Sequence, residues 1–484
     1  MISKRFLKNS LIYTVAGSLN LASAVILLPF YISYLSPSTL GVLSIYTTFA
    51  LLIQIFVTYS FDTAVYTYYH EFKKDTHQLN RYLSSSFTFV LCAGLIVGTV
   101  LALTGELIFA NVFSGKSISF YPYGILSVLS GIFQAVVKVN SSRLQTQEKA
   151  VSFLWINLVS FSLTAILTIV GLHVFPDSLF GPIGGKLVAM AVTGLWVLAI
   201  VYKQHGFHFD FPLIRSTLGF NHPSLLYQVM VWFNGFYDRM LMAVYLPLSQ
   251  VGIYDFVAKC LSVIEFALSG FYNSFFPKVL GILALQKEKK STIEINRYYN
   301  GLTAVTLILV SVCIFSFPVI LKVAVEYLGK TKYLEAIQWV PFLAITYLFR
   351  SMRFYVVMPY SALQYFKPLP VFYLFIVAAK ISSMVILIPH YGIMGLVIAT
   401  WIGYVVEISV LYAGIRKRFV MNFNSWKLVV IPLVMTVAIL SLEPIGGNSF
   451  PLLIHAFYIF LTTVMLAWVY RPELKKLKIG EILK

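Results

Sequence analysis

The segment from Tyr34 to Gly41 reads YLSPSTLG, and the segment from Tyr245 to Gly252 reads YLPLSQVG. The apolar stretches before them also match, because SLIY begins at Ser10 and SLLY begins at Ser224. An even number of apolar stretches separates the two copies, so both copies cross a membrane in the same direction. The repeat therefore predicts two halves related by an axis along the membrane normal, as in transporters built from parallel repeats.

The composition around this repeat is that of a membrane protein. Of the 484 residues, 59% are hydrophobic and 11% are charged, and the mean hydropathy is +0.83. Soluble domains are about 45–50% apolar and about 25% charged, so a cytosolic enzyme is excluded. A membrane helix needs about 20 apolar residues. Stretches of spanning length lie near residues 10–33, 40–66, 82–103, 120–140, 151–175, 182–202, 222–245, 250–275, 299–323, 337–358, 369–388, 393–414, 427–443 and 451–470.

The basic residues predict the orientation of these helices. The chain has 36 Lys and Arg against 18 Asp and Glu, a net charge of +18. If both termini are cytoplasmic, 26 of the 36 lie in cytoplasmic segments and six lie inside helices, which leaves four in outer loops: Lys116, Lys322, Lys330 and Lys332. This asymmetry follows the positive-inside rule. We therefore expect a multi-pass protein with both termini cytoplasmic and no nucleic-acid partner.

The repeat and the apolar stretches together predict an all-α integral membrane protein of about 14 transmembrane helices. Its expected parts are a six-helix lobe over residues 1–210, a second six-helix lobe over 211–420, and two further helices with a basic cytoplasmic tail over 421–484. Two such lobes with short connections favour alternating access through a central cavity.

Three short motifs resemble those of a known superfamily. They are the hairpin from Leu35 to Gly41, the run Asp238-Arg239-Met240-Leu241, and Val251-Gly252-Ile253-Tyr254 followed by Lys259. With these motifs, the length and the helix count, the chain resembles the polysaccharide-exporter and multidrug-exporter (MOP) superfamily, whose fold is MATE-like. Within it, the chain is most similar to the Wzx-type O-antigen flippases.

The resemblance implies a function. Such a flippase moves an undecaprenyl-diphosphate-linked oligosaccharide, an O-antigen or other surface-polysaccharide repeat unit, across the bacterial cytoplasmic (inner) membrane. It is not an enzyme, and H+ or Na+ coupling without a resident cofactor is expected. The implied partners are membrane lipids, a polysaccharide polymerase and a chain-length regulator, with the flippase itself a monomer. By analogy with related flippases, the last two helices hold the lipid tail.

Ionisable residues inside the predicted helices are the candidate site residues. Each costs about 2.5–3.5 kcal/mol at the centre of a membrane helix, so they are expected to face one another or a wet cavity. The basic ones are Lys186, Arg239, Lys259, Arg350, Arg353 and Lys380, and the acidic ones are Asp62, Asp238, Asp255, Glu265 and Glu407. We expect no catalytic residue and no metal ligand among them.

Depth divides these residues into two groups. Arg239, Asp255 and Lys259 lie toward the outer ends of neighbouring helices, where they form either a structural ion-pair cluster or part of an outer gate. Arg350 and Arg353 share a helix face, with Lys380 and Glu407 at similar depth.

Guanidinium groups bind phosphate oxygens in pairs and lysine adds a point charge, so the basic residues of both groups, namely Arg239, Lys259, Arg350, Arg353 and Lys380, are candidates for substrate binding. The alternative for Arg350 and Arg353 is that their helix ends early and both snorkel to the cytoplasmic interface. The acids Asp62, Asp238, Asp255, Glu265 and Glu407 are candidates for ion coupling or gating.

Three other functions are compatible with parts of this pattern. A multidrug or cation exporter of the same superfamily would favour an acidic cavity, whereas the membrane-embedded charges here are slightly basic. A membrane polymerase or glycosyltransferase would need a larger outer loop than residues 104–119 provide. A peptidoglycan-precursor flippase differs only in its substrate.

The topology makes a direct prediction. A reporter fused after Lys289 should show activity on the cytoplasmic side, and one fused after Ser117 should show it on the outer side. Alkaline phosphatase and green fluorescent protein fusions measure the two sides independently. The reverse pattern would overturn the orientation.

Overall fold

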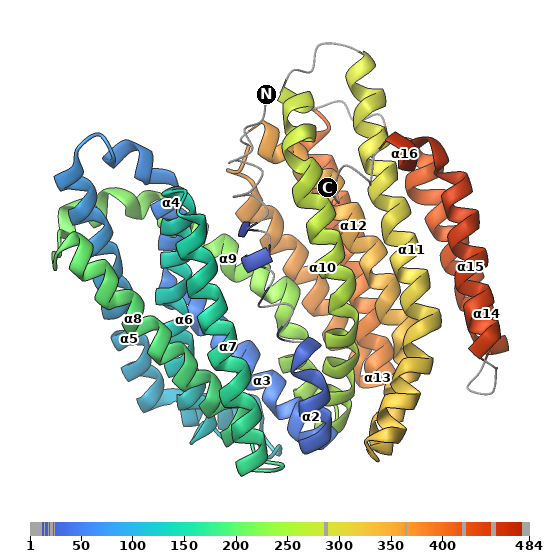
Figure 1. The fold of residues 1–484 in the computed structure, drawn as a ribbon, viewed down its shortest axis with the longest axis horizontal. Coiled ribbons are helices and arrows are strands. Elements are labelled where there is room, and N and C mark those ends of the chain that lie inside the picture. Colours follow the sequence, from blue (N-terminus) through green and yellow to red (C-terminus); the bar gives the residue numbers. More distant parts are fainter. Residues whose placement is uncertain are drawn as a thin grey trace. The chain divides into compact units, whose positions relative to one another are not determined.

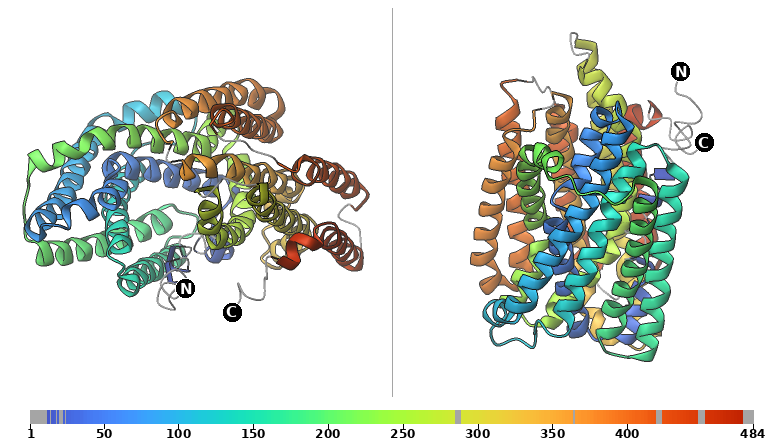
Figure 2. Two further views of the ribbon diagram at one scale, coloured as in Figure 1. Left: turned by 90° about the horizontal axis from the view of Figure 1, so that it is seen from above. Right: turned by 90° about the vertical axis from the view of Figure 1, so that its left-hand side faces the viewer.

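The computed structural model describes residues 25–284, 289–363, 365–418, 423–446 and 452–476, together with residues 12, 13, 15–17, 19 and 23. Over this part of the chain every regular element is a helix. The chain forms two compact units, Met1–Asp255 and Phe256–Lys484, which are described separately. Within each unit the helices run side by side along roughly one direction (Figures 1 and 2).

The first unit contains the helices of the N-terminal half and the first turns of α10. Its helices are α2 (Leu28–Tyr34), α3 (Pro37–Thr58), α4 (Phe61–Phe72), α5 (Thr76–Val112), α6 (Tyr123–Thr146), α7 (Ala150–Val174), a π-helical turn (Phe180–Gly184), α8 (Gly185–His205), α9 (Phe211–Tyr245) and the start of α10 (Leu248–Ala284). The centre of this unit is the contact of α6 with α3 and α8.

The second unit contains the rest of α10 and all later helices. These are α11 (Lys289–Tyr327), a 3₁₀ segment (Thr331–Trp339), α12 (Val340–Ala362), α13 (Leu369–Ile415), a π-helical turn (Trp426–Val430), α14 (Ile431–Gly446), α15 (Leu452–Val469) and α16 (Arg471–Lys476). α12 packs between α11 and α13.

The helices confirm a multi-pass, all-helical membrane protein. Among the described residues, eight helical segments are long and apolar enough to cross a membrane, and Trp426–Ala438 and Ile454–Val469 are shorter apolar helices. The predicted total of fourteen and the predicted division at residues 210 and 420 stay predictions. The predicted first stretch, 10–33, lies partly outside the described residues.

The two copies of the repeat meet in the first unit, where α3 crosses the start of α10. A Cβ added at Gly41 would lie 2.2 Å from the Leu248 carbonyl oxygen, and one added at Gly252 would lie 1.8 Å from the Pro37 carbonyl oxygen. In the alignment of the repeats, Gly41 corresponds to Gly252 and Pro37 to Leu248. The two contacts therefore join equivalent positions of the two copies in opposite directions, as expected for a local two-fold axis.

The start of α3 is fixed by a cap. The Ser36 hydroxyl accepts a hydrogen bond from the Thr39 amide at 3.2 Å, and Pro37 occupies the first turn, where its missing N–H is not needed. The Asp177 carboxylate accepts hydrogen bonds from the Ser36 amide at 3.1 Å and the Thr39 hydroxyl at 3.0 Å. This cap holds α3 at the position where it meets α10.

The sequence predicts one continuous helix over the apolar stretch 40–66, and this prediction is wrong, because the stretch forms two helices. Tyr59 and Ser60 adopt left-handed backbone conformations, with φ of 48° and 58°, so α3 ends just before these two residues and α4 begins just after them. Because neither residue is the glycine that usually occupies such a position, no local sequence signal marks the break. The break places Asp62 in the first turn of α4.

α13 contains two predicted stretches, 369–388 and 393–414, joined by a sharp turn. Gly392 has φ 58° and ψ −133°, a non-helical conformation. Residues before the turn contact residues after it, since Tyr373 bonds Glu407 and Gly403 lies against the Lys380 side chain. α13 is therefore a helical hairpin that folds back on itself at Gly392.

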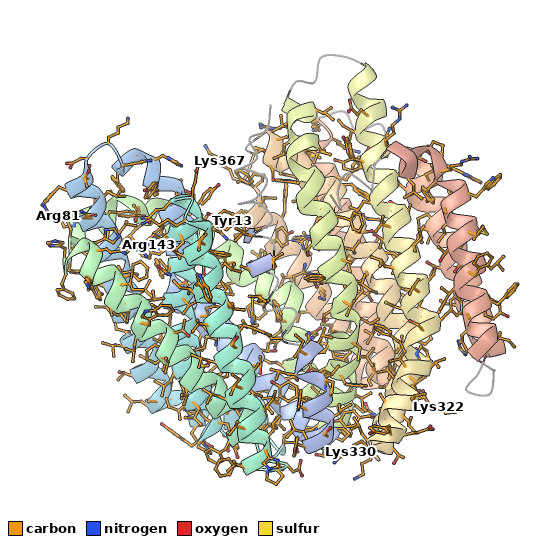
Figure 3. All side chains as sticks on the ribbon, in the orientation of Figure 1. Tyr13, Arg81, Arg143, Lys322, Lys330 and Lys367 are labelled. Carbon is orange, nitrogen blue, oxygen red and sulfur yellow. The ribbon has the colours of Figure 1, made fainter. Side chains whose placement is uncertain are left out.

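The basic residues labelled in Figure 3 are distributed between the helix ends as the predicted topology requires. In the second unit, Lys367 lies at the end opposite Lys322 and Lys330 (Figure 3), in agreement with their predicted cytoplasmic and outer positions. In the first unit, Arg81 and Arg143 lie at the same end, since α5 starts where α6 finishes (Figure 3). Which end faces the cytoplasm stays a prediction.

The C-terminal helices pack on the second unit at α11, which contacts α15 extensively (Figure 1). At the predicted cytoplasmic end, the Glu473 carboxylate pairs with the Lys427 amine at 2.7 Å and accepts from the Asn300 amide at 3.2 Å. The Tyr470 hydroxyl donates to the Lys427 carbonyl at 2.6 Å, and burial raises the pKa of Tyr470. These contacts connect α16 to α11 and to the π-helical turn that precedes α14.

The glycine crossing makes a stability prediction. Gly41→Ala and Gly252→Ala should each lower the thermal unfolding temperature, because the added methyl group meets backbone and overpacking costs about 1–3 kcal/mol. Gly219→Ala on α9 is the control, since a Cβ there has open space and alanine favours a helix. Unfolding of the purified variants in one detergent measures the difference. Wild-type unfolding temperatures for both crossing variants would contradict the contact.

Candidate functional site

Most of the charged side chains inside the helices gather in three clusters. Two lie in the first unit, one beside the α3–α10 crossing and one at the break between α3 and α4. The third lies in the second unit, between α10, α12 and the α13 hairpin. Lys186 joins none of them: it lies in the first turn of α8, half-buried.

The first cluster is centred on Arg239 of α9. Its guanidinium contacts the Asp238 carboxylate at 2.8 Å and the Asp255 carboxylate at 3.3 Å. The Tyr254 hydroxyl donates to Asp238 at 2.6 Å, and the guanidinium lies over the Tyr254 ring. The expected cluster of Arg239 and Asp255 is therefore present. Lys259, one turn further along α10, falls in the second unit.

The second cluster surrounds Asp62 at the break between α3 and α4. The Lys138 amine of α6 approaches the Asp62 carboxylate to 3.2 Å, and the Gln228 amide of α9 donates to it at 3.3 Å. Beside it, the Tyr59 hydroxyl and the His222 ring lie 2.5 Å apart. Asp62 thus receives an ion pair from α6 and a hydrogen bond from α9. The Lys138 side chain is partly exposed, so this ion pair can open.

The third cluster begins with Arg350 of α12, which forms an ion pair with Glu265 of α10. The Arg350 side chain is 36% exposed and the Glu265 side chain 27%, so a ligand can reach both. Arg350 also lies over the Tyr347 ring. An accessible guanidinium with one carboxylate partner can exchange that partner for a phosphate oxygen.

Arg353, one turn further along α12, is held more firmly. Its Nε lies 2.6 Å from the Glu407 carboxylate, whose side chain is fully buried. Its terminal nitrogen donates to the Tyr373 hydroxyl at 2.8 Å, and that hydroxyl donates to Glu407 at 2.8 Å. The triangle of Arg353, Tyr373 and Glu407 joins α12 to both arms of the α13 hairpin.

Lys380 completes the third cluster on the first arm of α13. Its side chain is buried, and its aliphatic stem lies against Gly403 on the second arm. With Lys259, Arg350 and Arg353, the second unit contains four of the predicted internal basic residues against two acids, Glu265 and Glu407. This basic excess was expected from the sequence.

The snorkelling alternative for Arg350 and Arg353 does not fit the observed helix. α12 continues to Ala362, so both arginines lie well inside it rather than at an early end. Each contacts an acidic side chain on a neighbouring helix. Their roles as substrate contacts stay a prediction.

Sequence reasoning missed several members of these clusters. The count of cytoplasmic basic residues includes those of 138–150, and so Lys138 at the end of the stretch 120–140, but α6 runs to Thr146. Gln228 and Tyr373 are uncharged, so a search for ionisable residues did not select them. A helix-period reading of the polar residues beyond the apolar stretch would have kept Lys138 inside the helix.

The fold and these clusters define a class: a multi-pass helical membrane protein with charged side chains paired inside its helix bundles. The family described as polysaccharide biosynthesis protein matches residues 6–280. Because this match covers more than half of the chain, the protein belongs to that family. It is 24% identical to Lsg locus protein 1 of Haemophilus influenzae over 299 residues, covering 59% of this chain and 68% of the relative.

Solved structures support the same fold. The lipid II flippase MurJ, in an inward closed conformation, superposes with a TM-score of 0.72 at 15% identity, over 97% of this chain and 99% of that one. An inward-facing multidrug-resistance MATE transporter of the MOP superfamily gives 0.60 at 13% identity, over 90% and 96%. At these identities the likeness shows the fold alone, and it confirms the predicted MATE-like architecture.

The Arg353–Glu407 pair makes a testable prediction. Arg353→Met should strongly destabilise the protein, by about 3–5 kcal/mol, because it leaves the buried Glu407 carboxylate without its cation. The double variant Arg353→Met with Glu407→Gln should recover much of that loss, because no charge then lacks its partner. Thermal unfolding of the wild type, the two single variants Arg353→Met and Glu407→Gln, and the double variant measures the coupling between the two sites. Equal losses for the single and double variants would contradict it.

Proposed function

We propose that this protein moves a polyprenyl-diphosphate-linked oligosaccharide, the repeat unit of a surface polysaccharide, across the bacterial cytoplasmic membrane by alternating access. The observation that carries the proposal is the third cluster, where accessible Arg350 lies beside Arg353 and Lys380 inside the helix bundle. Membership in the polysaccharide biosynthesis family supports it. So does the fold shared with a protein described as a lipid II flippase.

The chemistry of the cluster fits a diphosphate. Three basic side chains, Arg350, Arg353 and Lys380, outnumber Glu265 and Glu407 by one formal charge. A small excess suits one or two phosphate groups better than a polyanion, and it disfavours a cationic drug. A guanidinium binds phosphate through paired hydrogen bonds, and the exposed part of Arg350 offers such a pair.

The Arg350–Glu265 pair supports a route to ion coupling. A substrate phosphate and the Glu265 carboxylate compete for the same guanidinium. Binding of phosphate releases the carboxylate, which is then available to a coupling H+ or Na+. Glu265 is therefore the proposed link between substrate binding and an ion gradient. Asp62, Asp238, Asp255 and Glu407 stay candidates for coupling or gating.

The remaining parts of the proposal concern placement. The orientation with both termini cytoplasmic puts Arg350 and Arg353 in the inner half of their helix, where substrate made in the cytoplasm would arrive. The C-terminal helices carry exposed apolar side chains on α14 and α15, among them Leu433, Val437, Phe457, Phe460 and Trp468. We propose that the polyprenyl tail lies against these helices, and that a polymerase and a chain-length regulator act beside the flippase.

The test uses a deletion strain in which the sidedness of polyprenyl-linked oligosaccharides is assayed with a membrane-impermeant sugar-modifying reagent. Loss of the protein should trap completed units on the cytoplasmic leaflet. Wild-type protein should restore export, and Arg350→Gln should restore it about 10- to 100-fold less, since a charged hydrogen bond is worth about 1.5–3 kcal/mol. Normal sidedness in the deletion strain, with new drug sensitivity, would assign the protein as an exporter instead.

A double variant separates substrate binding from structure. If Arg350 only neutralises Glu265, then Glu265→Gln combined with Arg350→Gln restores export. If Arg350 binds phosphate, the double variant stays as defective as Arg350→Gln. Arg81→Gln, at an exposed ion pair with Asp210, is the control for a lost arginine, and immunoblotting confirms equal protein in each strain.

A further inference from the structure

The predicted cytoplasmic end of α6 carries a row of buried polar atoms without partners. Asn140, Arg143 and Gln147 lie three and four residues apart, so they share one face of the helix. Both side-chain atoms of the Asn140 amide, the Arg143 Nε and the Gln147 carbonyl oxygen are buried and make no hydrogen bond. Asn140 and Arg143 are each 1% exposed.

Arg143 contacts only neutral side chains. Its terminal nitrogen donates to the Gln204 oxygen at 3.3 Å and to Nε2 of His205 at 3.0 Å. The other ring nitrogen of His205 lies 2.6 Å from the Asn80 oxygen, so it carries the proton and the ring is neutral. Among the described residues, none of the carboxylates at this end forms an ion pair with Arg143.

Two nearby carboxylates interact with groups other than Arg143. Asp210 pairs with Arg81 at 2.8 Å, and Asp75 caps α5 by accepting from the His77 amide at 2.8 Å. Lys149, exposed on the connection to α7, lies close enough to Arg143 that burial and this second cation lower the pKa of Lys149. Glu71 and Glu148 also lie at this end, but no described carboxylate forms an ion pair with Arg143, so its charge is not balanced by direct contact.

A buried guanidinium in such a place needs an anion. Burying an unpaired charge costs several kcal/mol, and four of the buried polar atoms without partners lie together beside this charge. Arg143 Nε and the Asn140 nitrogen are free donors, while the Asn140 and Gln147 oxygens are free acceptors. A group that satisfies all four atoms must both accept and donate hydrogen bonds, and one that also balances the guanidinium must be an anion, which leaves out chloride because chloride cannot donate.

We propose that Asn140, Arg143 and Gln147 form a binding site for a phosphate group, with the exposed Lys149 nearby. A protonated phosphate accepts from Arg143 and Asn140 and donates to a carboxamide oxygen. The group comes either from free inorganic phosphate or from the headgroup of a phosphatidylethanolamine, whose ammonium is also a donor. This site lies in the first unit and does not depend on the proposed function.

The test measures thermal unfolding of the purified full-length protein. In detergent, inorganic phosphate at ten times its Kd should raise the unfolding temperature by about 1–2 °C, and chloride at equal ionic strength should not. Arg143→Met should remove the response, whereas Arg81→Met, the matched control at the same end, should keep it. A response only in nanodiscs containing phosphatidylethanolamine, and not in phosphatidylcholine alone, would identify the headgroup as the source.

A second variant keeps the test decisive if Arg143→Met does not fold. Asn140→Asp has nearly the same shape and places a carboxylate beside Arg143, so it should unfold at a higher temperature without phosphate and no longer respond to phosphate. Native mass spectrometry of the wild type should show a bound phosphate or phospholipid. A wild type that neither source stabilises, or an Asn140→Asp variant that still responds, overturns the site.

Discussion

The cost of placing ionisable side chains inside a membrane is the constraint on which this structure depends. Each such group costs about 2.5–3.5 kcal/mol if it faces lipid near the centre of a helix. The described helices meet this constraint by bringing charges of opposite sign together from different helices. Arg239 and Asp255 join α9 to α10, Lys138 and Asp62 join α6 to α4, and Arg353 and Glu407 join α12 to α13. Each of these pairs thus adds a polar contact between two helices that are neighbours in the fold.

The pairs differ in how easily they can be separated, and this difference is what a transport cycle can use. Glu407 is fully buried and is bonded by both Arg353 and Tyr373, so its loss affects the fold. Arg350 and Glu265 are accessible, so their contact can open without exposing a buried charge. On α12, the buried Arg353–Glu407 pair therefore lies one turn from the accessible Arg350–Glu265 pair, whose carboxylate can be exchanged for another anion.

The sequence predicted the features that depend on composition and spacing. Long apolar stretches predicted the apolar parts of the described helices, although α5, α9 and α11 extend well beyond them, and the repeated YLxxxxxG motif predicted that two halves correspond. Ionisable residues in those stretches predicted the Arg239–Asp255 contact, and they placed Arg353 at the depth of Glu407. These predictions held because a charge inside an apolar stretch stands out without knowledge of the fold.

The features that the sequence did not predict depend on contacts between distant segments. The α3–α4 break rests on left-handed Tyr59 and Ser60, residue types that are ordinary inside a helix. Lys138 and Arg143 were assigned to a connection because the apolar pattern fades before α6 ends. At that end, polar residues face other helices rather than water, and no periodicity within one helix shows which neighbour they meet.

The crossing of Gly41 and Gly252 also bears on the history of the chain. In a dimer of two identical half-length chains, each chain would supply the same glycine and the same neighbouring residue to the crossing. A substitution in that chain would therefore appear at both contacts. In the fused chain the two sides vary separately, and they have done so, since Pro37 stands where the other half has Leu248. Both halves keep glycine at the crossing itself, where an added Cβ would meet the backbone of the other helix.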